Sequence, residues 1–317
     1  MSAMCFHIKL IFEGGITWYV IKGLVFICHG AAEHCLCYNE LAENIKQKGY
    51  YVFAHDHVGH GQSQGDRVHI EDFSQYTRDV FHHIEMVKKR FSDKLPVFII
   101  GHSMGGAISI VAAMEKPKYF TSVILIGPAI VGSPEAASPM KIFLGKIIAK
   151  IFPQMPVLKL DTKAISRDPE VVKKYEDDPL AYHGGLKASL SILMFKIDGR
   201  WGVALLKAME QMEKGMESIE WSFFVLHGDQ DRMCDVRGSK MLYEKAASKD
   251  KKLKSVFIDD FQEFLFYIKM YAFNFYVYKN EEKNYGTNLM FSEEKECYNA
   301  QFSVLPVDAD LIFIFNI

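Results

Sequence analysis

The sequence has 317 residues, of which 49% are hydrophobic and 24% are charged. These values are typical of a packed globular protein and exclude a disordered or fibrous chain. The 37 basic and 39 acidic side chains leave a formal net charge of −2. This balance gives no reason to expect nucleic acid as a partner.

The N-terminal region shows no secretion signal. Its apolar stretch, residues 6–21, is interrupted by His7, Lys9 and Gly14, so we expect two short strands around a turn. The six cysteines are sparse and irregularly spaced, which is typical of reduced thiols in a cytoplasmic protein. Cys35 and Cys37 form a C-x-C pair without a second pair of ligands, so the sequence predicts no zinc site and no metal.

Short apolar runs alternate along the chain with segments of helical length. Nearly continuous apolar runs are typical of strands that are buried on both faces. Their alternation with helices predicts parallel strands joined by crossover helices, which is an α/β fold with a mostly parallel central sheet and helices on both faces. Strands are predicted at 24–28, 51–54, 97–100, 123–126, 223–226 and 253–258, and helices at 40–48, 74–90 and 105–116.

A different pattern occupies residues 133–215 approximately. Its amphipathic helical periodicity predicts a cap inserted between two strands of the sheet, and such caps cover pockets. Within it, residues 140–152 combine an apolar side with Lys141, Lys146 and Lys150. Two interpretations stay open for this segment: peripheral contact with a membrane surface, and a helix packed on the core with solvated lysines.

Gly101–Gly105 reads Gly-His-Ser-Met-Gly and lies between a predicted strand and a predicted helix. A serine at such a strand-to-helix turn is presented at the edge of the sheet, and the glycines are needed because side chains would not fit beside it. The sequence therefore predicts Ser103 as a nucleophile. Backbone N–H groups that stabilise the oxyanion are expected from Met104 and from Ala31, in the loop after the first predicted strand.

Two further segments carry polar residues at predicted strand ends. The spacing of His55, His57 and His60 matches no metal-binding signature, and no second ligand set follows, so we interpret 55–63 as a glycine-rich loop rather than a metal site. Asp231 follows the strand predicted at 223–226, where a carboxylate can orient an imidazole. Asp229 and Asp235 are the alternatives, interpreted as solvated.

Together, segments 29–34, 53–63, 101–107 and 231–235 resemble the monoacylglycerol lipase family of serine α/β-hydrolases, and the resemblance covers residues 24–258 approximately. It implies an α/β-hydrolase fold and cleavage of a monoacylglycerol or similar lipid ester to glycerol and a fatty acid, without a cofactor. It also implies the roles of nucleophile for Ser103, of triad acid for Asp231 and of oxyanion donors for Ala31 and Met104. Four further residues would line the substrate pocket, with Cys234 as a reactive thiol: Glu33, His102, Tyr175 and Cys234.

The sequence departs from the family where the general base is expected. After the last predicted strand the chain reads Asp-Asp-Phe-Gln-Glu-Phe at 259–264, and the last of the twelve histidines is His227, which precedes Asp231. Neither Gln262 nor Glu263 replaces an imidazole well at neutral pH. We therefore expect an α/β-hydrolase domain at 1–258 and an atypical tail at 259–317. Residues 194–204 also look like an insertion in the cap.

Two functions follow from this departure. Loss of the histidine from a serine hydrolase lowers turnover by about 2 × 10⁶, which equals roughly 8 to 9 kcal/mol of barrier. The chain is then either a serine esterase of monoacylglycerols with much reduced activity, or a catalytically impaired protein that binds lipid or another partner.

Overall fold

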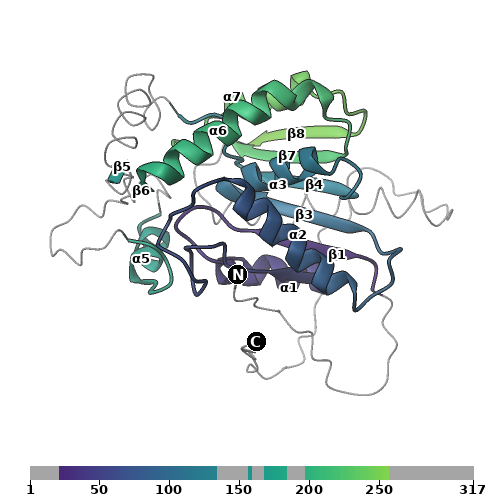
Figure 1. The fold of residues 1–317 in the computed structure, drawn as a ribbon, viewed down its shortest axis with the longest axis horizontal. Helices are drawn as coiled ribbons and strands as arrows, with labels where there is room; N and C mark the ends of the chain where they lie inside the picture. Colours follow the sequence, from purple (N-terminus) through teal and green to yellow (C-terminus); the bar gives the residue numbers. More distant parts are fainter. Residues whose placement is uncertain (1–20, 134–155, 159–167, 184–196, 257–317) are drawn as a thin grey trace, which may run out of the picture.

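The computed structural model describes residues 21–133, 156–158, 168–183 and 197–256 (Figure 1). Its centre is a parallel sheet with the strand order β2-β1-β3-β4-β7-β8. The strands of this sheet are β1 (Leu24–Cys28), β2 (Tyr51–Ala54), β3 (Val97–His102), β4 (Ser122–Ile126), β7 (Phe223–Gly228) and β8 (Lys251–Val256).

Helices connect these strands in the order that the sequence predicts, and the α/β class is confirmed. They are α1 (Asn39–Lys46), α2 (Ser74–Lys88), α3 (Met104–Glu115), α5 (Pro169–Asp177), α6 (Gly199–Gly215) and α7 (Val236–Lys245), with short 3₁₀ turns η1 (Cys35–Tyr38) and η3 (Met216–Ser218).

Two hydrophobic cores lie on opposite faces of the sheet, because successive strand side chains alternate between the faces. In β1, Leu24, Phe26 and Cys28 belong to the core that α2, α3 and α6 cover. Val25 and Ile27 belong to the second core, under α1. Every residue of β1 is buried, so the continuous apolar run reflects a strand covered by helices on both sides.

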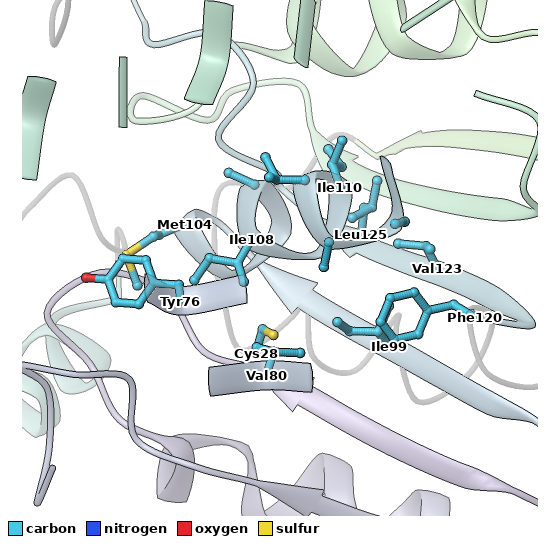
Figure 2. Close-up of a cluster of buried hydrophobic side chains, with 14 of the residues drawn as sticks. Cys28, Tyr76, Val80, Ile99, Met104, Ile108, Ile110, Phe120, Val123 and Leu125 are labelled. Atoms are coloured by element: carbon cyan, nitrogen blue, oxygen red, sulfur yellow. The ribbon is translucent and has the colours of Figure 1, made fainter. Parts of the chain in front are cut away.

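Helix α3 is buried at the centre of the first core. Figure 2 shows Met104, Ile108 and Ile110 of α3 among side chains of α2 and of the sheet. Only its last residues reach solvent, and small residues such as Ala107 and Ala112 let it lie close to the strands. The N-terminus of α3, and with it the turn at Ser103, is therefore held by the packed core.

Some element bounds differ from the predicted ones. The last strand begins at Lys251 and not at Leu253, because residues 251–256 pair in register with the whole of β7. Apolar runs could not reveal this start, since β8 is partly exposed and carries three lysines. Residues 257–258 of the predicted strand lie outside the described residues.

Between β4 and β7 the described residues form α5, α6 and a small antiparallel pair, β5 (Pro156–Leu158) with β6 (Ile197–Asp198). Helix α6 buries Trp201, Ala204, Ala208 and Met212, an apolar stripe of helical spacing that packs on the core beside α3. The Trp201 indole donates to the Tyr76 hydroxyl of α2 at 3.1 Å. The lysine-bearing segment 140–152 lies outside the described residues.

Among the described helices, none combines the length and the apolar character that a transmembrane span requires.

Candidate active site

Ser103 forms the sharp turn between β3 and α3. Its backbone has φ 50° and ψ −116°, a conformation that side chains rarely adopt and that costs about 1–3 kcal/mol. Four backbone hydrogen bonds hold it. The Ser103 N–H donates to Ile126 O at 3.0 Å, and its carbonyl accepts from the N–H groups of Gly106, Ala107 and Ala129 at 2.9–3.2 Å.

The glycines around Ser103 are required by close packing. A Cβ atom on Gly101 would lie 2.3 Å from the carbonyl oxygen of Gly105, and one on Gly105 would lie 2.2 Å from the carbonyl oxygen of Cys28. Both contacts are to backbone atoms, which cannot move aside as a flexible side chain would. The G-x-S-x-G spacing therefore allows the turn to press directly against the end of β1.

The 29–33 loop follows β1 and lies beside this turn. Cys28 at the end of β1 pairs with Gly101 of β3, which brings the loop next to Ser103. Ala32 adopts a positive φ of 63°, which reverses the chain direction there. Within the described part of the chain, the backbone N–H groups of Ala31 and Met104 have no hydrogen-bond partner. Both are therefore available as donors to an anionic oxygen.

A histidine and an aspartate fix the 29–33 loop to the loop that follows β2. His29 Nδ1 donates to the Gly30 carbonyl at 2.8 Å, and its Nε2 accepts from the His57 N–H at 2.9 Å. Asp56 accepts from the N–H groups of Cys35 and Gln62, each at 2.8 Å. Burial alone would raise the pKa of Asp56, but these hydrogen bonds outweigh it and lower the pKa. The predicted glycine-rich loop at 55–63 therefore holds the 29–33 loop in place.

Glu33 and His102, which were predicted to line the pocket, lie in one hydrogen-bonded cluster with Tyr38. Glu33 Oε1 accepts from the Gly30 N–H, from the Tyr38 hydroxyl at 2.5 Å and from His102 Nδ1 at 3.1 Å. Burial alone would raise the pKa of Glu33, but the His102 imidazole and the hydrogen bonds from His102 and Tyr38 lower it to about 2. Glu33 is therefore ionised at neutral pH.

Tyr175 comes from α5, and its hydroxyl contacts the 29–33 loop. Its hydroxyl lies 3.1 Å from the Ala32 carbonyl and 3.2 Å from the Tyr182 carbonyl. The Tyr182 N–H also donates to the Ala32 carbonyl, at 2.9 Å. Since carbonyls only accept, the Tyr175 hydroxyl is the donor in these contacts.

Asp231 follows β7 and is held with a defined orientation. Its Oδ1 accepts from the N–H groups of Met233 and Cys234 at 2.8 and 2.9 Å. Its Oδ2 faces Gly127, because a Cβ atom built on that glycine would lie 3.2 Å from Oδ2. By contrast, Asp235 caps α7 and pairs with the exposed Arg237. Of the two, Asp231 is the one with a carboxylate oxygen left for an imidazole.

His227 lies near Asp231, but its ring nitrogens bind other groups. Its Nε2 is 3.6 Å from Asp231 Oδ2, yet this nitrogen donates to the Cys234 carbonyl at 3.0 Å, and Nδ1 meets the Ser239 hydroxyl at 2.7 Å. Both ring nitrogens are thus engaged in a side chain that has no exposed surface. Burial lowers the pKa of His227 in spite of the Asp231 carboxylate. His227 holds the Asp231 loop and cannot accept a proton from Ser103.

The Ser103 hydroxyl meets a thiol where a base is expected. Its Oγ lies 3.7 Å from Cys234 Sγ, the one side-chain hydrogen-bonding partner of this hydroxyl among the described residues. Burial and the nearby Asp231 raise the pKa of the Cys234 thiol. A neutral thiol does not activate a serine.

Most of the residues that the sequence singled out lie near one another in the structure. The structure brings together Ser103, Met104, Ala31, Glu33, His102 and Cys234, with Asp231 directly behind Cys234 and Tyr175 over the 29–33 loop. The segment 259–264, where the family's base is expected, lies outside the described residues. Sequence reasoning missed Tyr38, His29 and Asp56, because their partners are decided by the fold and no spacing signals them.

His55, His57 and His60 serve as packing residues. Their rings are buried and lie edge to face, with His55–His57 and His57–His60 centroids 5.2 and 6.5 Å apart. Burial lowers the pKa of His55 and of His60 to about 3, so both rings are neutral at physiological pH. Their ring nitrogens do not converge in a metal-binding group within the described residues.

Comparison with known proteins decides the family. The sequence profile of the family described as "Serine aminopeptidase, S33" matches residues 20–257. The mouse protein "Monoglyceride lipase" is 41% identical over 233 residues, which cover 74% of this chain and 73% of that protein. The chain belongs to the monoglyceride lipase family of serine α/β-hydrolases.

Two further relatives support this assignment. The "Monoacylglycerol lipase" of Mycolicibacterium smegmatis is 36% identical over 74% of this chain and 79% of its own length. The crystal structure of a monoacylglycerol lipase from Paleococcus ferrophilus superposes with a TM-score of 0.66 and 28% identity, covering 80% of this chain and 95% of that one. The α/β-hydrolase fold is thereby confirmed, and the relatives of this chain are carboxylic ester hydrolases.

Proposed function

We propose that this chain binds monoacylglycerols, or lipid esters like them, and transfers their acyl group to Ser103 at a rate far below that of a complete triad. The observation that carries the proposal is the strained turn at Ser103, placed beside two unpartnered N–H groups, those of Ala31 and Met104. This turn would act as a nucleophile elbow and these donors as an oxyanion hole.

The residues that the resemblance assigns to a substrate pocket suit a glycerol headgroup. Glu33 is ionised, and its Oε2 makes no hydrogen bond within the described residues, so it can accept from a hydroxyl group. His102 and Tyr175 are the other polar side chains that we assign to the headgroup. The hydroxyl groups of glycerol are good donors to such acceptors, and a simple alkyl ester lacks these hydroxyl groups.

The reduced rate follows from the missing base. His227 is engaged elsewhere and no histidine follows it in the sequence, so no side chain in the described part of the chain is placed to take the proton from the Ser103 hydroxyl. A serine hydrolase without its histidine still accelerates the reaction about 10³- to 10⁴-fold over the uncatalysed reaction in water, through its oxyanion hole and substrate binding.

A chimera tests this assignment. We would measure glycerol release from a monoacylglycerol by this chain, and by a chimera in which residues 259–317 are replaced by the tail of the mouse monoglyceride lipase. We expect the chimera to be faster by at least about 10⁴-fold. The variant Ser103→Ala of the chimera should lose that gain. A chimera that folds and stays as slow as the parent would contradict the proposal.

Glu33→Gln in the chimera tests the headgroup assignment. It should slow the release of glycerol from a monoacylglycerol more than it slows the hydrolysis of the corresponding ethyl ester. Equal effects on both substrates would show that Glu33 acts on the loop alone.

The second candidate function is lipid binding without turnover. It is favoured by the contact of the Ser103 hydroxyl with a neutral thiol. A fluorophosphonate probe separates the two functions, because even slow labelling of Ser103 requires a hydroxyl that can attack an electrophile. Binding of a fluorescent fatty-acyl ligand with no labelling over hours would favour this second function.

We also propose a cytoplasmic location with peripheral membrane contact through the cap, which rests on Lys141, Lys146 and Lys150. Sedimentation with anionic vesicles tests it, with the three lysines changed to glutamine as the control. Equal sedimentation of both proteins would remove the support for the cap as the contact.

A further inference from the structure

Three potential metal ligands meet between the cap and the 29–33 loop. His34 directly follows that loop, Cys37 lies in η1, and Asp178 follows α5, 144 residues away from His34. His34 Nε2 lies 2.8 Å from Asp178 Oδ2 and 3.5 Å from Cys37 Sγ. The three ligand atoms all lie within 4.8 Å of one another.

The arrangement converges on one point. In a proton relay such as a Cys-His-Asp triad, the thiol and the carboxylate contact different nitrogens of the imidazole ring. Here Cys37 and Asp178 both approach the same nitrogen, Nε2 of His34. A single proton on Nε2 serves two acceptors poorly, whereas a cation in its place would be bound by all three atoms.

The nitrogen–sulfur distance is the one that matches a tetrahedral zinc ion. With Zn–N near 2.05 Å and Zn–S near 2.3 Å, ligand atoms at tetrahedral angles lie about 3.6 Å apart for nitrogen and sulfur, and about 3.3 Å for nitrogen and oxygen. The observed nitrogen–sulfur distance is 3.5 Å. The nitrogen–oxygen distance of 2.8 Å is that of a hydrogen bond, and it would lengthen by about half an ångström when zinc replaces the proton.

We propose that His34, Cys37 and Asp178 form a binding site for one Zn²⁺ ion, which links the cap to the 29–33 loop. Solvent can supply the ion and the fourth ligand, since 27% of the Asp178 side chain is exposed and Cys37 is half-buried. Asp178 is already oriented, because its Oδ1 accepts from the Leu180 N–H at 2.8 Å.

The binding of Zn²⁺ to these three ligands balances in protons. Burial raises the pKa of the Cys37 thiol to about 12, with Glu33 adding to the effect, so the thiol is protonated without metal and would release one proton to solvent on binding Zn²⁺. The Nε2 proton of His34 moves to Nδ1, which is buried and has no hydrogen-bond partner within the described residues. The imidazole would bind the ion in its neutral form, as a zinc ligand must.

A bound ion would add a second link between cap and loop. Tyr175 of α5 already contacts the Ala32 carbonyl. Asp178 lies three residues further along, so the ion would hold the same segment at a second point. We therefore expect Zn²⁺ to raise the thermal unfolding temperature.

Cobalt substitution tests the site. The full chain, free of any affinity tag and treated with chelator and reductant, is titrated with Co²⁺ and followed by absorption spectroscopy. We expect one equivalent to produce a near-ultraviolet charge-transfer band from a thiolate ligand. Cys37→Ser should remove this band, and Asp178→Asn should weaken binding by at least about tenfold. Cys35→Ser is the matched control and should keep the band, because Cys35 lies outside the group.

Alkylation of the unmodified chain gives a second measurement that needs no variant. Zn²⁺ should slow the reaction of Cys37 with iodoacetamide at least tenfold, as read from peptide masses. The proposal is overturned if one equivalent of Co²⁺ gives no thiolate band, if the band survives in Cys37→Ser, or if Zn²⁺ leaves the alkylation of Cys37 unchanged.

Discussion

Replacing Ser103 by glycine and by alanine tests the strained turn directly. Both variants lose the hydroxyl, whose one side-chain hydrogen bond among the described residues is the long one to Cys234 at 3.7 Å. Only glycine adopts φ 50° and ψ −116° without strain, which should relieve about 1–3 kcal/mol. The greater freedom of glycine in the unfolded chain costs about 0.5–1 kcal/mol. Ser103→Gly should therefore be more stable than Ser103→Ala by about 1 kcal/mol.

Thermal unfolding followed by circular dichroism measures this difference. For a domain of this size we expect the glycine variant to unfold roughly 2–4 °C above the alanine variant. Gln211, an exposed residue inside α6, provides the control with opposite sign. There Gln211→Gly should be less stable than Gln211→Ala by about 1 kcal/mol. If Ser103→Ala were as stable as Ser103→Gly, the backbone at this turn would not be strained and the inference of an elbow would fail.

Three further predictions concern stability. Gly105→Ala would place a Cβ 2.2 Å from a backbone oxygen and should lower the free energy of unfolding by at least about 3 kcal/mol. A Cβ at Gly202 meets nothing within 4 Å, so Gly202→Ala should stabilise α6 by about 0.5–1 kcal/mol. Urea unfolding compares the two variants. Glu33 has a folded pKa of about 2 against 4.5, so its contribution of about 3 kcal/mol is complete above pH 4.5 and is lost as the pH falls toward 2. Glu33→Gln should flatten the dependence of the unfolding temperature on pH in that window, and an unchanged slope would refute the assignment. Trp201→Phe removes one buried hydrogen bond and should lower the free energy of unfolding by about 1–2 kcal/mol. An unchanged free energy of unfolding would show that the packing of α6 does not depend on that hydrogen bond.

The elements buried on both faces could be read from the sequence. The runs at β1, β2 and β4 are continuously apolar because the sheet is covered by helices on both sides, and each lies within one residue of its predicted bounds. The predicted start of edge strand β8 is two residues late, because its exposed lysines resemble a loop. Burial on both faces therefore made a strand predictable, and exposure hid the start of one.

The same contrast holds for the site. Ser103 and its flanking glycines were predictable because a sharp turn leaves a local signature: only certain residues fit it. Asp231 was predictable from its place after a strand. The Glu33–Tyr38–His102 cluster was not, since its hydrogen bonds join residues as far as 69 positions apart.

The sequence by itself determined the α/β class, the turn at Ser103 and the absence of a histidine beyond His227, because each is a matter of local pattern or simple presence. Only the tertiary structure decided that both nitrogens of His227 are engaged, and that Asp178 meets Cys37 and His34. The C-x-C pair gave no reason to predict a metal, because the carboxylate comes from the end of α5, far along the chain. Contacts between distant segments depend on how the chain packs, and no local pattern encodes them.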